Sequence, residues 1–415
     1  MILTKYKLGE ILDVTRGASL SGEYYATEGE YIRLTCGNFD YQNNCFKENK
    51  SKDNLYYVGD FKSEFLMEEG DIITPLTEQA IGLLGSTAII PESGKYIQSQ
   101  DVAKIICKED LLDKDFAFYL ISSALVKQQL SAAAQQTKIR HTSPDKIKDC
   151  TVWIPELSEQ KRIGKLLRSI DRKIELNRAI NQNLEAMAKQ LYDYWFVQFD
   201  FPNEEGKPYK SSGGEMVWNE KLKRKIPNEW DNCKLKDFIN LFDSKRIPLS
   251  SKDREERKGN YPYYGATGIM DYVNEYIFDG DYILLAEDGS TSDSKGFPIV
   301  QYIWGKNWVN NHAHIILPKN EQYLMFTYQM LRSIPAKQIE TGSIQKKISQ
   351  ENLCEYNMVL PNSILIEKYE SIISPLWEKR KLCIEEINAL IKQRDELLPL
   401  LMNGQASVNS DLSAY

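Results

Sequence analysis

Two long helical stretches, one central and one C-terminal, constrain the fold of this chain more than any other feature. Residues 155–199 contain no proline after Pro155, and apolar side chains recur there every seven residues. A heptad pattern sustained over about four repeats predicts a coiled-coil helix on the order of 60 Å long. The two rows of its predicted seam are Ile163, Ile170, Asn177, Leu184 and Leu191, and Leu166, Lys173, Ile180, Met187 and Tyr194.

The polar residues Lys173 and Asn177 interrupt this seam, which predicts a specific partner helix, because a polar seam residue selects register and partner. The partner is predicted within the same chain, since a shift of 206 residues carries Pro155 onto Pro361 and Leu184 onto Leu390. We expect Pro375, which has no counterpart in the first copy, to kink or delay the second helix. The predicted helix-pair seam comprises Ile163, Ile170, Leu184, Leu191, Leu376, Leu390 and Leu397.

The segments that precede the two helices also repeat each other. Residues 70–74 (GDIIT) match 280–284 (GDYIL), residues 102–106 match 312–316, and residues 136–143 match 342–349. A long internal repeat of this kind determines the fold class. We therefore predict an α+β chain with two mixed α/β domains in tandem, separated by two long antiparallel coiled-coil helices that a local twofold axis relates. The predicted segments are domain 1 (1–154), a central helix (155–200), a linker (201–229), domain 2 (230–361), a C-terminal helix (362–404) and a tail (405–415).

Short apolar runs between turn residues predict the strands of these domains. In the first domain the strands are expected at 7–11, 31–34, 70–74, 87–90 and 102–106, and helical spacing predicts one helix over 115–130. The matching runs of the second domain are 234–238, 280–284 and 312–316.

Composition limits the classes of protein that this chain can represent. Its 415 residues suffice for two or three domains, and no apolar run reaches the 18 or so residues of a membrane span. We expect no signal peptide. Seven cysteines without CxxC spacing indicate reduced thiols in a cytoplasmic protein. The net charge of −7 disfavours general nucleic-acid binding, so a DNA-binding function has to depend on local basic surface.

Several segments in this order resemble the specificity (S) subunit of type I restriction–modification systems, and the resemblance covers nearly the whole chain. The segments are GDIITPLTEQAIG (70–82), LYDYWFVQFDFP (191–202), GDYILLAEDG (280–289), WVNNHAHIILP (308–318), TGSIQKKIS (341–349) and LLPLLMNG (397–404).

The resemblance implies two target-recognition domains that each read half of a bipartite, asymmetric double-stranded DNA site. It also implies that the helices set the spacing and dock two methyltransferase subunits and, with them, restriction subunits. Adenine-N6 methylation and ATP-dependent cleavage would then belong to the partners, and no cofactor to this chain. S-adenosylmethionine, ATP and Mg²⁺ would bind the partner subunits.

The residues themselves also predict a chain without a catalytic site. No G-x-x-x-x-G-K or G-x-G-x-x-G motif is present, and none of the three histidines stands in a cysteine or acidic cluster with metal-ligand spacing. His312 and His314 alternate in an expected strand, which leaves packing, DNA contact or metal binding open. Asp281, Glu287 and Asp288 allow a metal nuclease or ordinary turn acids, and the matching part of the first domain has Thr74 and the neutral Gln79, which favours turn acids.

Three polar loops in each domain qualify as DNA contacts, because base edges and phosphates are read by basic, amide and hydroxyl side chains. They are residues 16–21 with 244–246, residues 77–79 with 290–295, and residues 135–141 with 343–347; a solvated basic turn is the alternative for the third pair. The candidate DNA contacts are Arg16, Ser19, Thr77, Gln79, Gln136, Lys138, Arg140, His141, Lys245, Arg246, Tyr263, Tyr264, Ser290, Lys295, Gln345, Lys346 and Lys347.

Some features remain open between a structural and a functional role. The basic cluster at 221–225 suits a solvated linker or phosphate contact, and the aromatic run 191–201 suits core packing or a methyltransferase surface. Arg172 and Glu175 suit a solvated helix face or a partner contact. Two rival functions also remain: a coiled-coil adaptor whose twin domains bind protein, and a nuclease with its own metal site.

Overall fold

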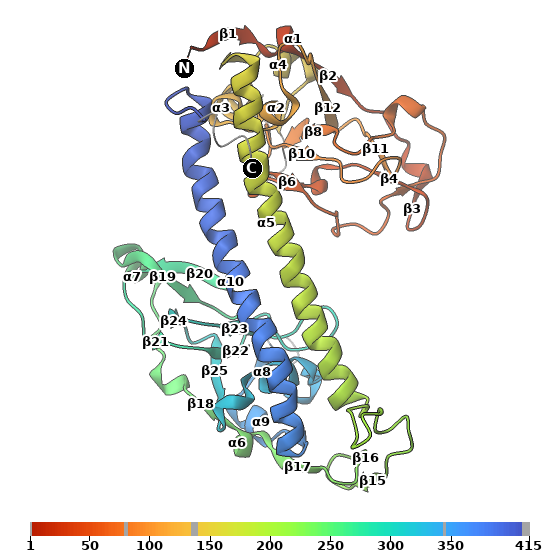
Figure 1. Cartoon of the computed structure of the whole chain (residues 1–415), viewed down its shortest axis with the longest axis vertical. Helices are drawn as coiled ribbons and strands as arrows, with labels where there is room; N and C mark the ends of the chain where they lie inside the picture. Colours follow the sequence, from red (N-terminus) through yellow and green to blue (C-terminus); the bar gives the residue numbers. More distant parts are fainter. Residues whose placement is uncertain (1, 79–81, 134–139, 343–345, 409–415) are drawn as a thin grey trace. The chain divides into compact units, whose positions relative to one another are not determined.

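The computed structural model describes residues 2–78, 82–133, 140–342 and 346–408 (Figure 1). The chain divides into two compact units, one with residues 1–177 and 385–415 and the other with residues 178–384. Each unit thus contains one globular part and one portion of each long helix, α5 (Leu157–Tyr192) and α10 (Ser363–Met402). None of the helices in the described ranges has both the length and the hydropathy of a bilayer-spanning segment.

The first unit is built on a four-stranded antiparallel sheet in the order β10-β8-β12-β2. All four residues of β8 are buried, as expected of a strand with a neighbour on each side. Gly70 enters β8 with a φ of +84°, a conformation that glycine adopts without a Cβ clash. These strands confirm the predictions at 70–74, 87–90 and 102–106. Their bounds are Leu12–Arg16 (β2), Ile72–Pro75 (β8), Ala88–Ile89 (β10) and Val102–Cys107 (β12).

A smaller sheet in the order β11-β4-β7-β3 packs beside it, and its β11 and β4 run parallel. The pair β1–β14 brings the N-terminus next to the segment that enters α5. The bounds are Thr4–Lys7 (β1), Tyr25–Ala26 (β3), Tyr31–Arg33 (β4), Phe39–Asp40 (β5), Cys45–Phe46 (β6), Tyr56–Tyr57 (β7), Tyr96–Ile97 (β11) and Thr151–Ile154 (β14).

Two local predictions in this unit are wrong. Residues 7–11 form the end of β1 and one helical turn, α1 (Leu8–Ile11), because the Glu10 carboxylate accepts the Lys7 N–H at 2.6 Å and caps the turn. The single helix expected over 115–130 is two helices, α2 (Lys114–Ile121) and α3 (Ala124–Ala133). The Ser123 hydroxyl accepts the Val126 N–H at 3.5 Å and so starts the second helix.

The second unit repeats this topology. Its central sheet β23-β22-β25-β18 corresponds to β10-β8-β12-β2, and β17–β28 corresponds to β1–β14. In the smaller sheet β21-β24-β19-β20 the strands β19 and β24 are parallel, like β4 and β11. The predicted duplication is therefore present in the fold.

The strands of the second unit are Asp231–Lys234 (β17), Ile239–Leu241 (β18), Lys258–Tyr264 (β19), Ile269–Val273 (β20), Phe278–Asp279 (β21), Tyr282–Ala286 (β22), Val300–Ile303 (β23), Lys306–Val309 (β24), Ala313–Pro318 (β25) and Asn357–Leu360 (β28). Its shorter helices are Leu235–Phe238 (α6), Ser251–Glu256 (α7), Leu324–Ser333 (α8) and Gln350–Glu355 (α9), and α4 (Pro144–Lys148) is the counterpart of α9 in the first unit.

Within the first unit, the start of α5 packs antiparallel against the end of α10. Ile170, Ile174 and Ile387 are buried together. The two polar seam residues meet one acid on the partner helix: the Asn177 amide donates to Glu386 at 2.7 Å, and the Lys173 ammonium lies 3.3 Å from the same carboxylate. Both polar residues of the predicted seam therefore contact the partner helix, and their role in selecting it stays a prediction.

Within the second unit, the end of α5 packs against the start of α10 through larger side chains. The Tyr369 hydroxyl donates to the Ala188 carbonyl at 3.1 Å, and the Tyr369 ring makes an edge contact with Tyr192. Of the predicted seam residues, Ile163 and Ile170 are buried, and Leu184, Leu191, Leu376, Leu390 and Leu397 are partly buried.

The second row of the predicted seam is wrong by one residue. Met187 is 54% exposed and Tyr194 is 37% exposed, whereas the next residues, Ala188 and Trp195, are 0% and 5% exposed. The buried second row, Leu167, Ile174, Ala188 and Trp195, keeps the seven-residue spacing but lies four residues after the first row rather than three. Met187 and Tyr194 therefore lie at the edge of the buried stripe, which packs on a globular part as well as on the other helix.

The structure also differs from the predictions at Pro375 and in the linker 201–229. Pro375 lies inside α10, which begins at Ser363, so the helix is not delayed. The predicted linker 201–229 contains a hairpin of β15 (Met216–Asn219) and β16 (Arg224–Pro227). Phe201 stacks on Trp230 with ring centroids 5.0 Å apart, and aromatic packing of this kind orders the segment.

Glu370 on α10 is a buried carboxyl group that makes the stability of the second unit depend on pH. Burial raises its pKa to about 7, although the Phe326 N–H and the Ser374 hydroxyl donate to it. The folded unit then binds a proton between about pH 4.5 and 7 that the unfolded chain has released, so stability falls as the pH rises through this window.

We predict that Glu370→Gln has little effect on the free energy of unfolding at pH 4.5 and raises it by about 3 kcal/mol at pH 8, because 1.36 kcal/mol corresponds to each unit of pKa shift. Urea unfolding followed by tryptophan fluorescence measures this, since every tryptophan except Trp153 lies in the second unit. Glu367→Gln, one turn earlier and exposed, is the control and should show no pH-dependent difference.

Candidate nucleic-acid interface

In the second unit, backbone hydrogen bonds at the end of β22 join the segment that leads into the second predicted loop to the third predicted loop. We call this set of hydrogen bonds the backbone frame. The Glu287 N–H donates to the His312 carbonyl at 2.8 Å, and the Ile348 N–H donates to the Glu287 carbonyl at 2.8 Å. Asp288 and Lys347 form a β-bridge next to these bonds. The loop after β22, the turn before β25 and the strand β27 (Lys347–Ile348) are thus held together.

Charged side chains reinforce this frame. Arg246 lies 2.8 Å from Glu287 and 3.4 Å from Asp243, and it donates to the Ala313 carbonyl at 2.8 Å. Lys347 lies 3.1 Å from the other oxygen of Glu287. Glu287 therefore bridges the first and third predicted loops of this unit. Burial opposes its ionisation, but the bonds from Arg246 and Lys347 and the charge of His314 lower its pKa.

His314 is fully buried beneath the frame and carries a proton on both ring nitrogens. Nδ1 faces the Asp243 carboxylate at 2.6 Å, and Nε2 faces the Ile348 carbonyl at 2.8 Å. Both partners are acceptors, so both nitrogens must donate. Burial opposes ionisation of Asp243, yet the bonds from His314, the Ile315 N–H and Gln350 lower its pKa. A buried imidazolium–carboxylate pair results.

This cluster does not suit a metal ion. Asp243, Glu287 and His314 are the one group in the described part of the chain whose potential ligand atoms all lie within 4.8 Å of one another. Both nitrogens of His314 already face other partners, the Asp243 carboxylate and the Ile348 carbonyl. The guanidinium of Arg246 already contacts both acids. In the structure the cluster is an ion network in which the buried His314 contacts Asp243 and lies 3.7 Å from Glu287.

The first unit has the same backbone frame with different side chains. The Leu76 N–H donates to the Asp101 carbonyl at 2.8 Å, and the Thr142 N–H donates to the Leu76 carbonyl at 2.9 Å. The strand β13 (Arg140–His141) pairs with β9 (Thr77–Glu78), so the second and third predicted loops meet here too. Arg140 lies 3.6 Å from the buried Glu78.

The first predicted loop joins the frame through an arginine in each unit. Arg16 donates to the Gln100 carbonyl at 2.8 Å, and Arg246 lies 3.3 Å from the Asn311 carbonyl. Both carbonyls belong to the turn that precedes the long strand of the central sheet, β12 or β25. The structure thus brings the three loop sets of each unit together, as far as their residues are described.

The remaining candidate contacts fall into three groups. Tyr263 is 1% exposed and its hydroxyl accepts the Leu249 N–H at 3.0 Å, so its role in this conformation is packing. Gln79, Gln136, Lys138 and Gln345 lie outside the described residues. Exposed or partly exposed on the loops are Arg16, Ser19, Arg140, His141, Lys245, Tyr264, Ser290, Lys295, Lys346 and Lys347, whereas Thr77 is buried at 9% exposure.

Sequence reasoning did not select Asp101 as a DNA contact and left the roles of His312 and Asp288 open. His312 Nδ1 lies 2.6 Å from the Asp288 carboxylate, and their side chains are 47% and 30% exposed. The Thr77 hydroxyl lies 3.4 Å from Asp101 and 3.4 Å from His141 Nδ1. The signal that could have found them is position: each directly precedes or follows an apolar strand of the central sheet.

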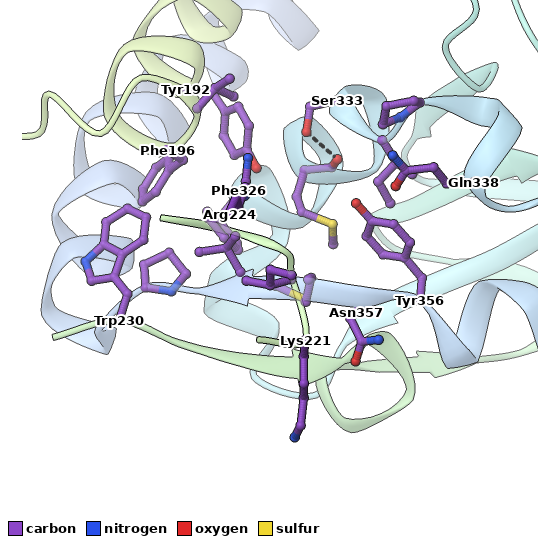
Figure 2. Close-up of a pocket in the computed structure, with 18 of the residues that line it drawn as sticks. Tyr192, Phe196, Lys221, Arg224, Trp230, Phe326, Ser333, Gln338, Tyr356 and Asn357 are labelled. Atoms are coloured by element: carbon purple, nitrogen blue, oxygen red, sulfur yellow. Dashed lines mark hydrogen bonds between the residues drawn. The ribbon is translucent and has the colours of Figure 1, made fainter. Parts of the chain in front are cut away.

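A pocket of about 660 Å³ also lies in the second unit, and none of the residues that line it belongs to the three loop sets. Figure 2 shows Phe196 beside Trp230, with their ring centroids 6.0 Å apart, and Tyr356 and Gln338 on the opposite side. Arg224 and Lys221 come from the hairpin β15–β16. Most of the aromatic run packs in the core, since its buried members are Tyr192, Trp195, Phe196, Phe199 and Phe201.

Comparisons with known proteins agree with the duplicated architecture. The family model described as "Type I restriction modification DNA specificity domain" matches residues 3–186 and 227–386. A crystal structure of a type I restriction–modification S subunit from M. genitalium shares the fold, with a TM-score of 0.62 at 18% identity over 97% of this chain and 96% of that chain.

Two curated relatives carry related names. The MjaIX specificity subunit of Methanocaldococcus jannaschii is 23% identical over 330 residues, 75% of this chain and 73% of its own length. A putative type I restriction enzyme specificity subunit of Haemophilus influenzae is 34% identical over 142 residues, 34% of this chain and 35% of its own length. Because the family model matches most of both halves, the chain belongs to the type I restriction–modification DNA specificity family.

We predict that Asp243→Asn destabilises the second unit by about 3–5 kcal/mol, because it leaves His314 and Arg246 as buried charges without their shared acid. Hydrogen exchange of the β25 amides measures the loss. The control is Glu220→Gln, which removes an exposed ion pair with Lys223 in the same unit and should cost less than about 1 kcal/mol. Equal effects of the two substitutions would contradict the structural role of the network.

Proposed function

We propose that the chain is the specificity subunit that directs a type I restriction–modification complex to a bipartite, asymmetric DNA site. The observation that carries this proposal is the common backbone frame, which occurs in both units with unlike side chains on it. A duplicated scaffold with different readers suits a site with two different half-sequences. The family match across both halves supports the same function.

The charge distribution is compatible with this role despite a net charge of −7. Exposed basic side chains gather on the loops, among them Arg16 and His141 in the first unit and Lys295 and Lys346 in the second. Phosphate contacts need such local positive groups rather than a basic protein as a whole.

The test of DNA reading is binding at several salt concentrations, followed by a domain exchange. We predict that affinity for the specific duplex falls steeply with salt, because counterions are released from the phosphates. We also predict that replacing residues 1–154 with those of a relative of different specificity changes one half of the methylated sequence only. Salt-independent binding favours the protein-adaptor alternative, and a change in both halves contradicts independent reading.

We further propose that the helices dock two methyltransferase subunits and that restriction subunits join through them. Leu176 on α5 and Leu382 on α10 are 55% and 59% exposed and correspond to each other in the 206-residue repeat. In the second unit, Met187, Tyr194 and Ile372 line an open groove of about 960 Å³. Exposed apolar residues at repeated positions suit two copies of one partner.

Catalysis in this proposal belongs to the partners. Adenine-N6 methylation with S-adenosylmethionine, and ATP- and Mg²⁺-dependent cleavage, take place on the methyltransferase and restriction subunits, in the cytoplasm. The chain itself contributes sequence recognition and spacing.

We predict that Leu176→Asp or Leu382→Asp lowers the number of bound methyltransferase subunits from two to one, because a charge in an apolar contact is costly to desolvate. Native mass spectrometry of the reconstituted complex measures this number. Lys392→Asp, at an exposed position of α10 outside these sites, is the control and should leave two subunits bound. DNA binding by the free chain should be unchanged in all three variants.

A further inference from the structure

Three positions on the backbone frame correspond between the two units, and their side chains differ. Equivalence follows from the hydrogen bonds of the frame: Leu76 and Glu287 each donate from N–H to the residue before the long strand and accept from the third loop. The first position is the residue whose carbonyl accepts the N–H of Leu76 or Glu287. The second is the residue that directly follows Leu76 or Glu287. The third is the residue of the third loop that pairs with the second position. They hold Asp101, Thr77 and His141 in the first unit and His312, Asp288 and Lys347 in the second.

The side chains at these positions contact one another in both units. In the first unit the Thr77 hydroxyl lies 3.4 Å from both the Asp101 carboxylate and His141 Nδ1. In the second unit the Asp288 carboxylate holds His312 Nδ1 at 2.6 Å. Each unit therefore orients one aspartate and one histidine, but at different positions among the three.

Hydrogen bonds hold the backbone beneath these side chains, and all of the side chains except the buried Thr77 are exposed or partly exposed. His312 and Lys347 side chains are 47% and 52% exposed, and His141 is exposed. Beneath them the buried His314 donates to the Ile348 carbonyl, and Glu287 contacts both Arg246 and Lys347. A fixed frame with exposed polar groups meets the geometric requirement for discriminating bases by hydrogen bonds.

We propose that these two triplets are specificity-determining residues, and that the exchange of side chains on a common frame is what makes the two half-sites different. This inference depends on the proposed DNA-reading function. The Asp101 carboxylate accepts hydrogen bonds only, so it selects a donor such as the cytosine amino group. The bond to Asp288 leaves His312 Nε2 as the ring nitrogen available to a base edge.

These residues differ in chemistry from residues that bind phosphates and so contribute only affinity. A phosphate contact weakens binding to all sequences alike and contributes to the salt dependence. Asp101 and Asp288 are anions and cannot gain from phosphate proximity. Their presence on the backbone frame therefore indicates selection among bases rather than attraction to the backbone.

The test uses the full chain with Asp101→Asn or His312→Asn, and a panel of duplexes in which each base pair of the wild-type site is replaced in turn. Fluorescence anisotropy gives the affinity for each duplex. We expect each variant to lose about 10- to 100-fold discrimination at one or two base pairs, in one half-site for Asp101→Asn and in the other for His312→Asn. The salt dependence should be unchanged.

Two further variants keep the result interpretable. Asp288→Asn leaves the His312 ring in place but weakens its orientation, and it should affect the same base pairs as His312→Asn. Asp271→Asn removes ion pairs with Arg254 and Lys258 in the smaller sheet of the same unit and should leave discrimination unchanged. Melting curves establish that each variant is folded.

The possible outcomes distinguish this inference from the proposed function. A wild-type chain without sequence preference would overturn both. A wild-type preference that Asp101→Asn and His312→Asn leave intact would overturn the inference alone. Equal loss in both half-sites, or the same loss with Asp271→Asn, would also overturn it, because the effect would then reflect general destabilisation.

Discussion

Each unit of this protein depends on burial of an apolar helix stripe that only the other long helix can cover. Ile170 and Ile174 of α5 are buried against Ile387 of α10 in one unit, and Tyr369 of α10 covers Ala188 of α5 in the other. A single helix of 36 or 40 residues would expose such a stripe to water. The pairing follows from internal duplication, since a chain that repeats its helix carries its own partner.

In addition to this helix pairing, backbone hydrogen bonds hold the surface loops of each unit, and side chains reinforce them. The bonds through Leu76 and Glu287 use groups that every residue has, so they persist whatever side chains the loops carry. A scaffold of this kind allows the exposed residues to change without loss of the fold. It therefore suits the proposed reading of two different half-sites by the two units.

The second unit adds a buried ion network where the first has mainly hydroxyl groups and one buried acid. Asp243, Glu287, Arg246 and His314 compensate one another beneath the loops, and each charge is satisfied by a hydrogen bond or an ion pair. Burial of charge is costly unless it is paired, so this network makes the relative positions of the loops specific. The two units thus reach the same loop arrangement by different interactions.

The sequence by itself determined the duplication, the two long helices, the central strands and the three loop sets, because these follow from periodicity and from turn residues. It also identified Asn177 as a polar seam residue, which in the structure contacts Glu386 of the partner helix. The tertiary structure decided that Met187 and Tyr194 lie outside the buried stripe, because the second row of buried residues follows the first by four residues rather than three, which depends on what each helix packs against. It also decided that Tyr263 is buried and that Asp101 and His312 occupy matching positions, since these depend on hydrogen bonds between residues far apart in the chain.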